Sequence, residues 1–258
     1  MQTVLFHSTI FGPIHSRRLG TSLGVNLSPD DGKVCSFDCL YCEAGFNAQG
    51  AGTTGLPPRE RVRKQLEDKL KAMKAAGENL DVITFSGNGE PTLHPDFAGI
   101  IDDTIALRNQ YFPEVKISVL SNSTRLEDAA VCDALRKVDN NILKLDSAIT
   151  PTMRMIDRPN SPEFTSDKVI DRLAEFGADC IVQTMILRGT HNGNTVDNST
   201  DEEVDALIEA YKKIRPAEVM LYSIDRKTPE ESLVKVDKEE LEQIADRIRE
   251  AGINVQVS

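Results

Sequence analysis

Three cysteines stand close together in the stretch KVCSFDCLYCEAG, residues 33–45. Cys35, Cys39 and Cys42 follow the pattern C-x3-C-x2-C, and the next cysteine along the chain is Cys132. A metal site closed by protein normally uses four side-chain ligands, so this group is one ligand short. The stretch therefore raises the question of what completes the site.

The chemistry of the thiolates leaves three interpretations open. Thiolates favour zinc or iron–sulfur clusters, and a 4Fe–4S cluster held by three cysteines keeps one iron open to an outside ligand. A zinc site would need a fourth ligand from a distant part of the chain, such as His15 or His94. CLYC also has the spacing of a dithiol redox pair, which leaves Cys35 unexplained. The iron–sulfur cluster is the favoured interpretation.

The composition excludes several classes of protein. The chain has 258 residues, of which 40% are apolar and 28% charged, as is typical of a globular protein with an ample core. It contains neither an apolar run long enough for a membrane helix nor a signal-peptide pattern at its start. An odd number of cysteines, three of them clustered, argues against a disulfide framework and favours a reducing cytoplasm. The net charge of −11 disfavours broad binding to nucleic acid.

Strand and helix patterns alternate regularly along the chain. Short, continuously apolar runs predict strands at 22–27, 81–87, 115–122, 141–147, 180–187, 218–224 and 253–258. Amphipathic periods predict helices at 60–77, 96–111, 126–138, 166–178, 200–214 and 237–252. This alternation predicts one α/β domain over residues 1–258, with a parallel sheet. Residues 1–21 are expected to lead into the first strand, and 46–58 and 188–200 are expected to be loops.

Polar residues gather where the predicted strands end. The first strand leads into the cysteines, the second into GNGEP (87–91), the third into Ser121 and Asn122, and the fourth into Lys144 and Asp146. Active sites of parallel α/β proteins lie at the carboxyl ends of their strands. We therefore expect these groups to surround one cavity.

The cysteine spacing, with Tyr41 before the last cysteine, resembles the signature loop of the radical S-adenosylmethionine (SAM) superfamily. GNGEP resembles the GGEP run of that family, with Asn88 in place of the second glycine. Between Phe11 and Arg226, the stretches FGPIHSRRLGTSLGVNLSP, FSGNGEPTLHPDF and LKLDS resemble a group of Fe–S oxidoreductases related to the wyosine-base tRNA-modifying enzymes. The resemblance implies a partial, open (β/α)6 barrel of the TIM-like type.

The resemblance also implies the cofactors. In the family, a 4Fe–4S cluster binds three cysteines, and the amino and carboxylate groups of SAM complete the shell of the fourth iron. The reduced cluster then cleaves SAM into methionine and a 5′-deoxyadenosyl radical, which abstracts hydrogen from a substrate. The electron would come from a donor such as flavodoxin or ferredoxin.

Carried onto this chain, the resemblance implies specific residues. The cluster ligands are Cys35, Cys39 and Cys42. The expected SAM contacts are Tyr41, Gly87, Asn88, Gly89, Glu90, Pro91, Ser121, Asn122, Lys144, Asp146 and Gln183. Candidate substrate contacts are Arg17, Arg18, His191 and Tyr222.

The sequence leaves the substrate open. A small molecule, a peptide or a protein fits the acidic chain best, because no added RNA-binding domain is visible. RNA-base modification by the same chemistry is the alternative, and it predicts a basic groove around Arg17, Arg18, Arg59 and Arg63. A zinc-stabilised binding protein without a reaction is a more distant possibility.

The cluster and zinc interpretations predict different colours. Anaerobically reconstituted protein is expected to be brown, with broad visible absorbance from iron–sulfide charge transfer. A zinc protein stays colourless, because zinc is a d¹⁰ ion without redox chemistry. Colourless protein after reconstitution with iron and sulfide contradicts the cluster assignment.

Overall fold

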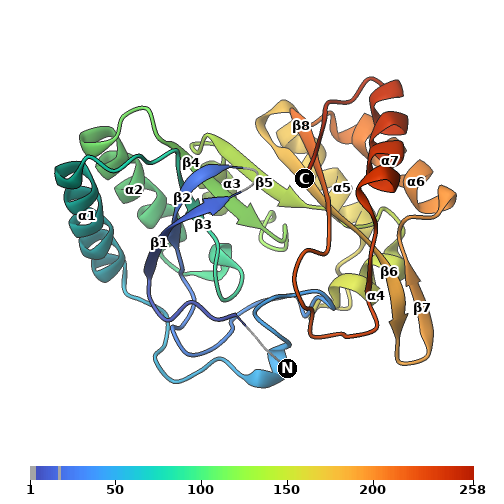
Figure 1. Ribbon diagram of the computed structural model, residues 1–258, viewed down its shortest axis with the longest axis horizontal. Coiled ribbons are helices and arrows are strands. Elements are labelled where there is room, and N and C mark those ends of the chain that lie inside the picture. The colour runs from blue at the N-terminus through green and yellow to red at the C-terminus, as the bar shows by residue number, and fades with distance from the viewer. Residues whose placement is uncertain (1–3, 17–18) are drawn as a thin grey trace.

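The computed structural model describes residues 4–16 and 19–258 (Figure 1), so Arg17 and Arg18 lie outside the described residues. One sheet runs through the molecule in the order β1-β2-β3-β4-β5-β6-β8-β10. Its strands are β1 (Ile10–Ser16), β2 (Gly20–Val25), β3 (Val82–Phe85), β4 (Lys116–Ser121), β5 (Asn140–Lys144), β6 (Ile181–His191), β8 (Glu218–Ser223) and β10 (Val255–Val257). The short strands β7 (Asn194–Asp197) and β9 (Val234–Lys235) pair with β6.

The sheet is parallel from β2 to β10, and only β1 runs antiparallel to its neighbour on this path. Among the described residues, no pairing joins β1 to β10, so the barrel is open. This confirms the predicted fold class. In sequence order, β2 to β6 and β8 are the six barrel strands, and β10 extends the sheet by a seventh parallel strand.

Helices cover the outer face of the curved sheet (Figure 1). They are α1 (Arg59–Ala76), α2 (Phe97–Tyr111), α3 (Ala129–Leu135), α4 (Thr150–Asp157), α5 (Ser166–Phe176), α6 (Asp201–Ile214) and α7 (Lys238–Glu250). The apolar period of α1 buries Val62, Leu66, Leu70 and Met73, and the helix ends at Gly77 in the left-handed conformation. Each helix within the described ranges is too short or too polar to cross a membrane.

The expectation of a loop at 188–200 is wrong. β6 continues to His191 and folds back through Asn192 and Gly193 into β7, so this segment is a hairpin. Both turn residues have positive φ, 50° for Asn192 and 79° for Gly193. An Asn-Gly pair is the residue choice that suits such a tight hairpin turn. The helix α4 was also absent from the sequence-based assignment.

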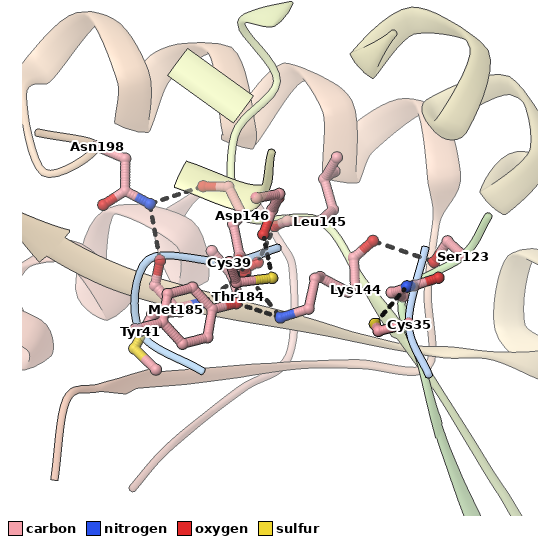
Figure 2. Close-up of polar contacts among 12 residues, drawn as sticks. Cys35, Cys39, Tyr41, Ser123, Lys144, Leu145, Asp146, Thr184, Met185 and Asn198 are labelled. Carbon is pink, nitrogen blue, oxygen red and sulfur yellow. Dashed lines mark hydrogen bonds and ion pairs between the residues drawn. The ribbon is translucent and has the colours of Figure 1, made fainter. Parts of the chain in front are cut away.

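Asn198, just after β7, holds together the ends of two central strands. Its side chain is fully buried and donates to the carbonyls of Asp146 and Met185, each at 2.7 Å. Its oxygen accepts the backbone N–H of Leu187 at 2.8 Å. One amide side chain thus satisfies three backbone groups, in the segment after β5 and in β6, and Figure 2 shows the bonds to Asp146 and Met185.

Replacing Asn198 by Ala is expected to lower the free energy of unfolding by about 3 kcal/mol, because three buried backbone groups lose their partner. Chemical denaturation measures this change. Asn194→Ala is the matched control, since Asn194 is exposed and makes one long side-chain contact, at 3.4 Å. Equal effects of the two substitutions contradict the role given to Asn198.

Candidate active site at the cysteine loop

The cysteine loop and the GNGEP turn are joined by backbone hydrogen bonds. Val34 N–H donates to the Asn88 carbonyl at 3.1 Å, and Glu90 N–H donates to the Val34 carbonyl at 3.0 Å. These bonds form an isolated parallel bridge between Val34 and Gly89. The residue before the first cysteine is therefore fixed against the end of β3.

Two glycines make this close approach possible. A Cβ at Gly89 would lie 1.9 Å from the Val34 carbonyl oxygen, and one at Gly87 would lie 2.5 Å from Asn26 Oδ1. Gly87 also has φ of +147°, which side chains rarely allow. Gly89 is required by the Val34 backbone that lies against it, and Gly87 by the Asn26 side chain and by its own φ.

Polar contacts within the loop define its path around the cysteines. Lys33 is buried, and its ammonium donates to the Gly45 carbonyl at 2.7 Å. Asn47 donates to the Phe37 carbonyl at 3.0 Å and to the Cys35 carbonyl at 3.4 Å. Lys33 and Asn47 thus close the loop across the cysteines.

The end of α4 supports the same loop from outside. Asp38 N–H donates to the Asp157 carbonyl at 3.0 Å, and Leu40 N–H donates to the Ile156 carbonyl at 2.9 Å. Leu40 and Ile156 are both fully buried and pack in one small apolar cluster. The cysteine loop is therefore a rigidly supported part of the fold.

The three cysteines line one cavity of about 290 Å³. Residues at or near the strand ends also line this cavity: Gly87, Gly89, Glu90, Ser121, Asn122, Lys144 and Tyr222. Gln183 of β6 and the loop residue Tyr41 complete this set. The expectation that the strand ends surround one cavity with the cysteines is confirmed for these residues.

The cysteine side chains differ in their surroundings. Asn122 Nδ2 lies 3.6 Å from Cys35 Sγ, and Cys39 Sγ donates to Asp157 Oδ1 at 3.4 Å (Figure 2). Burial, reinforced by the nearby Glu90 carboxylate, raises the pKa of Cys35 to about 12. Burial and the Asp157 carboxylate raise the pKa of Cys39 well above its usual value. A bound metal must therefore displace protons from these thiols.

No three His, Cys, Asp or Glu side chains within the described ranges are placed to hold a single metal ion. An iron–sulfur cluster makes a different demand, because each thiolate binds its own iron. Three thiols around one cavity, on a loop held against a glycine turn, fit such a cluster.

Glu90 is buried and accepts four hydrogen bonds from the protein. Its Oε1 accepts from Thr92 N–H at 3.1 Å, Thr92 Oγ1 at 2.6 Å and Ser121 Oγ at 2.9 Å. Its Oε2 accepts from Asn122 N–H at 2.6 Å. Burial raises the pKa of Glu90 although these donors oppose the shift. Oε2 has one lone pair left for a further donor in the cavity.

Lys144, Tyr41 and Asp146 form a polar group beside the cysteines (Figure 2), in which Asp146 is buried and the other two are half-buried. The Lys144 ammonium lies 3.3 Å from Asp146 Oδ2, and the Tyr41 hydroxyl contacts both partners. Burial acts to lower the pKa of Lys144, but the acidic groups around it, Asp146 foremost, together outweigh burial and raise the pKa well above its usual value. Lys144 is therefore a fixed positive charge at the cavity wall.

Some expected SAM contacts lie elsewhere. Asn88 is fully buried, and its side chain bonds Phe6 N–H and the Phe6 and Pro29 carbonyls. Pro91 begins a short 3₁₀ helix, and Asp146 is covered by Lys144 and by Met185 N–H at 2.9 Å. None of the three is part of the cavity lining. Asn88 and Asp146 instead bond backbone groups outside the cavity and so help to position the residues that line it.

Of the candidate substrate contacts within the described residues, one lines the cavity and one does not. Tyr222 lines the cavity, whereas His191 lies in the β6–β7 hairpin and its Nδ1 is 2.6 Å from Glu230 Oε2. Glu230 N–H in turn donates to the Leu40 carbonyl at 3.2 Å. His191 thus helps to position the connection that follows β8.

Sequence reasoning missed Asp157, Lys33 and Met185. Asp157 is 1% exposed, and burial together with Asp146 raises its pKa well above the usual value. Only a contact across 118 residues brings it to Cys39. Met185 lies two residues after Gln183 on β6, so the alternation of a strand was the available signal for it.

Comparisons with known proteins agree with this geometry. The family model of the radical SAM superfamily matches residues 31–199, which include all three cysteines and the cavity residues from Gly87 to Gln183. The chain belongs to the radical SAM superfamily. The radical SAM domain of this protein therefore has the cofactors of the superfamily, a 4Fe–4S cluster and SAM.

Relatives of this radical SAM protein are longer than the chain itself. The UPF0026 protein MJ1312 of Methanocaldococcus jannaschii is 30% identical over 237 residues, which are 90% of this chain and 68% of that protein. The chain spans 34% of a Brachyspira hyodysenteriae protein named GTPase Obg, to which it is 29% identical over 96% of its own length.

Solved structures share the fold at low sequence identity. A radical SAM methyltransferase from Sphaerobacter thermophilus has a TM-score of 0.66 at 15% identity, covering 92% of this chain and 65% of that one. TYW1 with a lysine–pyruvate adduct bound has a TM-score of 0.60 at 16% identity, covering 90% of this chain and 75% of that one. At such identity the likeness concerns the fold alone.

Cys39→Ala is expected to abolish cluster binding and SAM cleavage, because the buried thiol at the centre of the motif has no substitute. Iron and sulfide content and release of 5′-deoxyadenosine measure the two losses. Cys180→Ala is the matched control, since Cys180 is also buried but lies at the opposite end of β6. SAM cleavage retained by Cys39→Ala contradicts the ligand assignment.

Proposed function

We propose that Cys35, Cys39 and Cys42 hold the 4Fe–4S cluster and that Gly87, Gly89, Glu90 and Lys144 of the same cavity hold SAM. The substrate of the resulting reaction is proposed to be a small molecule or a group on a peptide or protein. The single observation that carries this proposal is the common cavity, in which three thiols face the GNGEP turn and the ends of β4, β5 and β6. When bound, the cluster and SAM together supply a 5′-deoxyadenosyl radical for hydrogen abstraction.

The proposed SAM contacts follow from charge and free hydrogen-bonding capacity. Glu90 Oε2 accepts one protein donor and has room for the SAM ammonium. Lys144 is a positive charge 13% exposed at its side chain, which suits a carboxylate. Gly87 and Gly89 let the backbone approach the ligand without a side chain in between.

RNA-base modification has weaker support. Of the basic residues expected to form a groove, Arg17 and Arg18 lie outside the described residues, and the other two are paired. Arg59 lies 2.7 Å from Asp103, and Arg63 lies 3.9 Å from Glu67. Such pairs cancel the positive field that a phosphate backbone needs. The likeness to TYW1 concerns the fold and does not supply a basic surface. A small-molecule or peptide substrate is therefore the better proposal.

The reaction needs one electron from outside the chain. We propose a carrier of the flavodoxin or ferredoxin type as the donor, because the cluster must be reduced before SAM is cleaved. Ser36 and Asn160 border a surface pocket of about 350 Å³ and flank Cys35, to whose carbonyl Asn160 donates at 3.3 Å. The pocket lined by Ser36 and Asn160 thus offers a short route for an electron from the surface to the proposed cluster ligand Cys35.

Glu90→Ala is expected to weaken SAM binding about tenfold or more, because a charge-assisted hydrogen bond to the ammonium is lost. The cluster should still assemble, and the free energy of unfolding should fall by about 2–4 kcal/mol as four buried donors lose their acceptor. Equilibrium binding of SAM and iron content separate the two effects. Glu114→Ala, at an exposed site outside this cavity, is the control. Loss of the cluster in Glu90→Ala, or unchanged SAM affinity, contradicts the proposed contact.

A further inference from the structure

A second cavity of about 370 Å³ adjoins the cysteine cavity. The two share a wall that includes Gly87, Leu120, Gln183 and Met185. A group that enters the second cavity therefore lies next to the proposed SAM site. The inference below rests on the proposed function and concerns what this second cavity accepts.

The strands give this cavity an uncharged wall. The six barrel strands each contribute lining residues, among them Ser22 from β2, Thr84 from β3, Leu120 from β4, Ile142 from β5, Gln183 from β6 and Met220 from β8. The edge strand β1 adds Ile14, His15 and Ser16. The hydroxyls of Ser22 and Thr84 bond each other at 2.8 Å, so part of their capacity is used. The ionisable lining residues are His15 on the edge strand β1, Tyr222 on β8, Cys42 on the cysteine loop, and Glu43, Asp225 and Arg226 on loops at the mouth.

Two of the charged residues at the mouth, Arg226 and Glu43, form an ion pair. Arg226 Nη1 lies 2.6 Å from Glu43 Oε2, and this pair links the connection after β8 to the cysteine loop. Both side chains are largely exposed, so the two charges keep most of their hydration when they pair. A charge carried deep into the cavity would find no such partner on the strand wall, and burying it unpaired is costly. The strand wall favours an uncharged group.

The side chain of Gln183 lacks the hydrogen bonds that other amide side chains near the site make. Its residue is 7% exposed, yet no donor or acceptor among residues 4–16 and 19–258 contacts its carboxamide. The buried amides of Asn88 and Asn198, by contrast, are bonded to backbone groups. Buried side-chain amides normally have partners, so the carboxamide of Gln183 is available to a ligand in the cavities that it lines.

We propose that Gln183 binds the reacting part of the substrate, and that this part is a neutral group with a hydrogen-bond donor beside an acceptor. A carboxamide offers both an NH₂ donor and a carbonyl acceptor, so an amide or cyclic amide edge matches it with two hydrogen bonds. A cavity of about 370 Å³ suits one ring or side chain. The rest of the substrate then stays at the mouth, beside the exposed side chains of Val4 and Ile14.

The test uses the whole chain, anaerobically reconstituted and saturated with SAM, and small probes in place of the unidentified substrate. Uracil and N-acetylglycinamide are the neutral amides, one of nucleobase and one of peptide type, and acetate and inorganic phosphate are the anions. Ligand-observed NMR titration measures the affinity of each probe. The variants are Gln183→Leu and Gln183→Glu, the second of which preserves the shape of the side chain. Gln256→Leu, on β10 and outside both cavities, is the matched control.

At least one neutral amide is expected to bind the wild type and the Gln256→Leu control, and to bind both Gln183 variants about tenfold more weakly. Iron content and SAM affinity should stay within about twofold of the wild type in all variants. The reason is that Gln183 is proposed to contact the substrate and neither the cluster nor SAM. Preference for uracil indicates a base-like substrate group, and preference for N-acetylglycinamide indicates a peptide-like one.

Three results overturn the inference: neither amide binds the wild type, an anion binds better than both amides, or the Gln183 variants bind the amides unchanged. A large loss of SAM affinity in Gln183→Leu overturns it as well, because Gln183 is then a SAM contact. Failure of the wild type to take up iron or SAM is a different outcome, since it contradicts the proposed function itself.

Discussion

The site depends on the backbone bridge between Val34 and Gly89. Two hydrogen bonds hold the start of the cysteine loop against the end of β3, at 3.0 and 3.1 Å. A side chain at Gly89 would strike the Val34 carbonyl, so the bridge requires glycine at this position. Because of this contact, a loop with little regular structure presents its thiols toward the strand ends. The proposed 4Fe–4S and SAM sites are therefore parts of one cavity.

Behind this bridge, buried polar side chains fix the groups that face the cavity. Glu90 orders Ser121 and Asn122, and Asn198 orders the segments after β5 and β6. Charges are placed unevenly: Lys144 and Glu90 lie at the proposed SAM site, whereas the strand wall of the second cavity is neutral. The arrangement separates a polar region for the cofactor from a less polar region for the substrate.

The sequence was sufficient for the features that depend on local pattern. The alternating apolar runs predicted the parallel strands, and the C-x3-C-x2-C and GNGEP motifs predicted which residues meet. It was insufficient where tertiary contacts decide the role of a residue. Asn88 bonds a segment 82 residues away, and Asp157 reaches Cys39 across 118 residues. The hairpin after β6 was missed because its polar residues outweighed the Asn-Gly turn signal.

The central claim is that the iron left without a protein ligand binds SAM. Electron paramagnetic and electron–nuclear double resonance spectra of the reduced protein, with SAM carrying ¹⁵N in its amino group, test it most directly. The account predicts that SAM changes the cluster signal and that a ¹⁵N coupling appears. A cluster signal that SAM leaves unchanged, without nitrogen coupling, would contradict it.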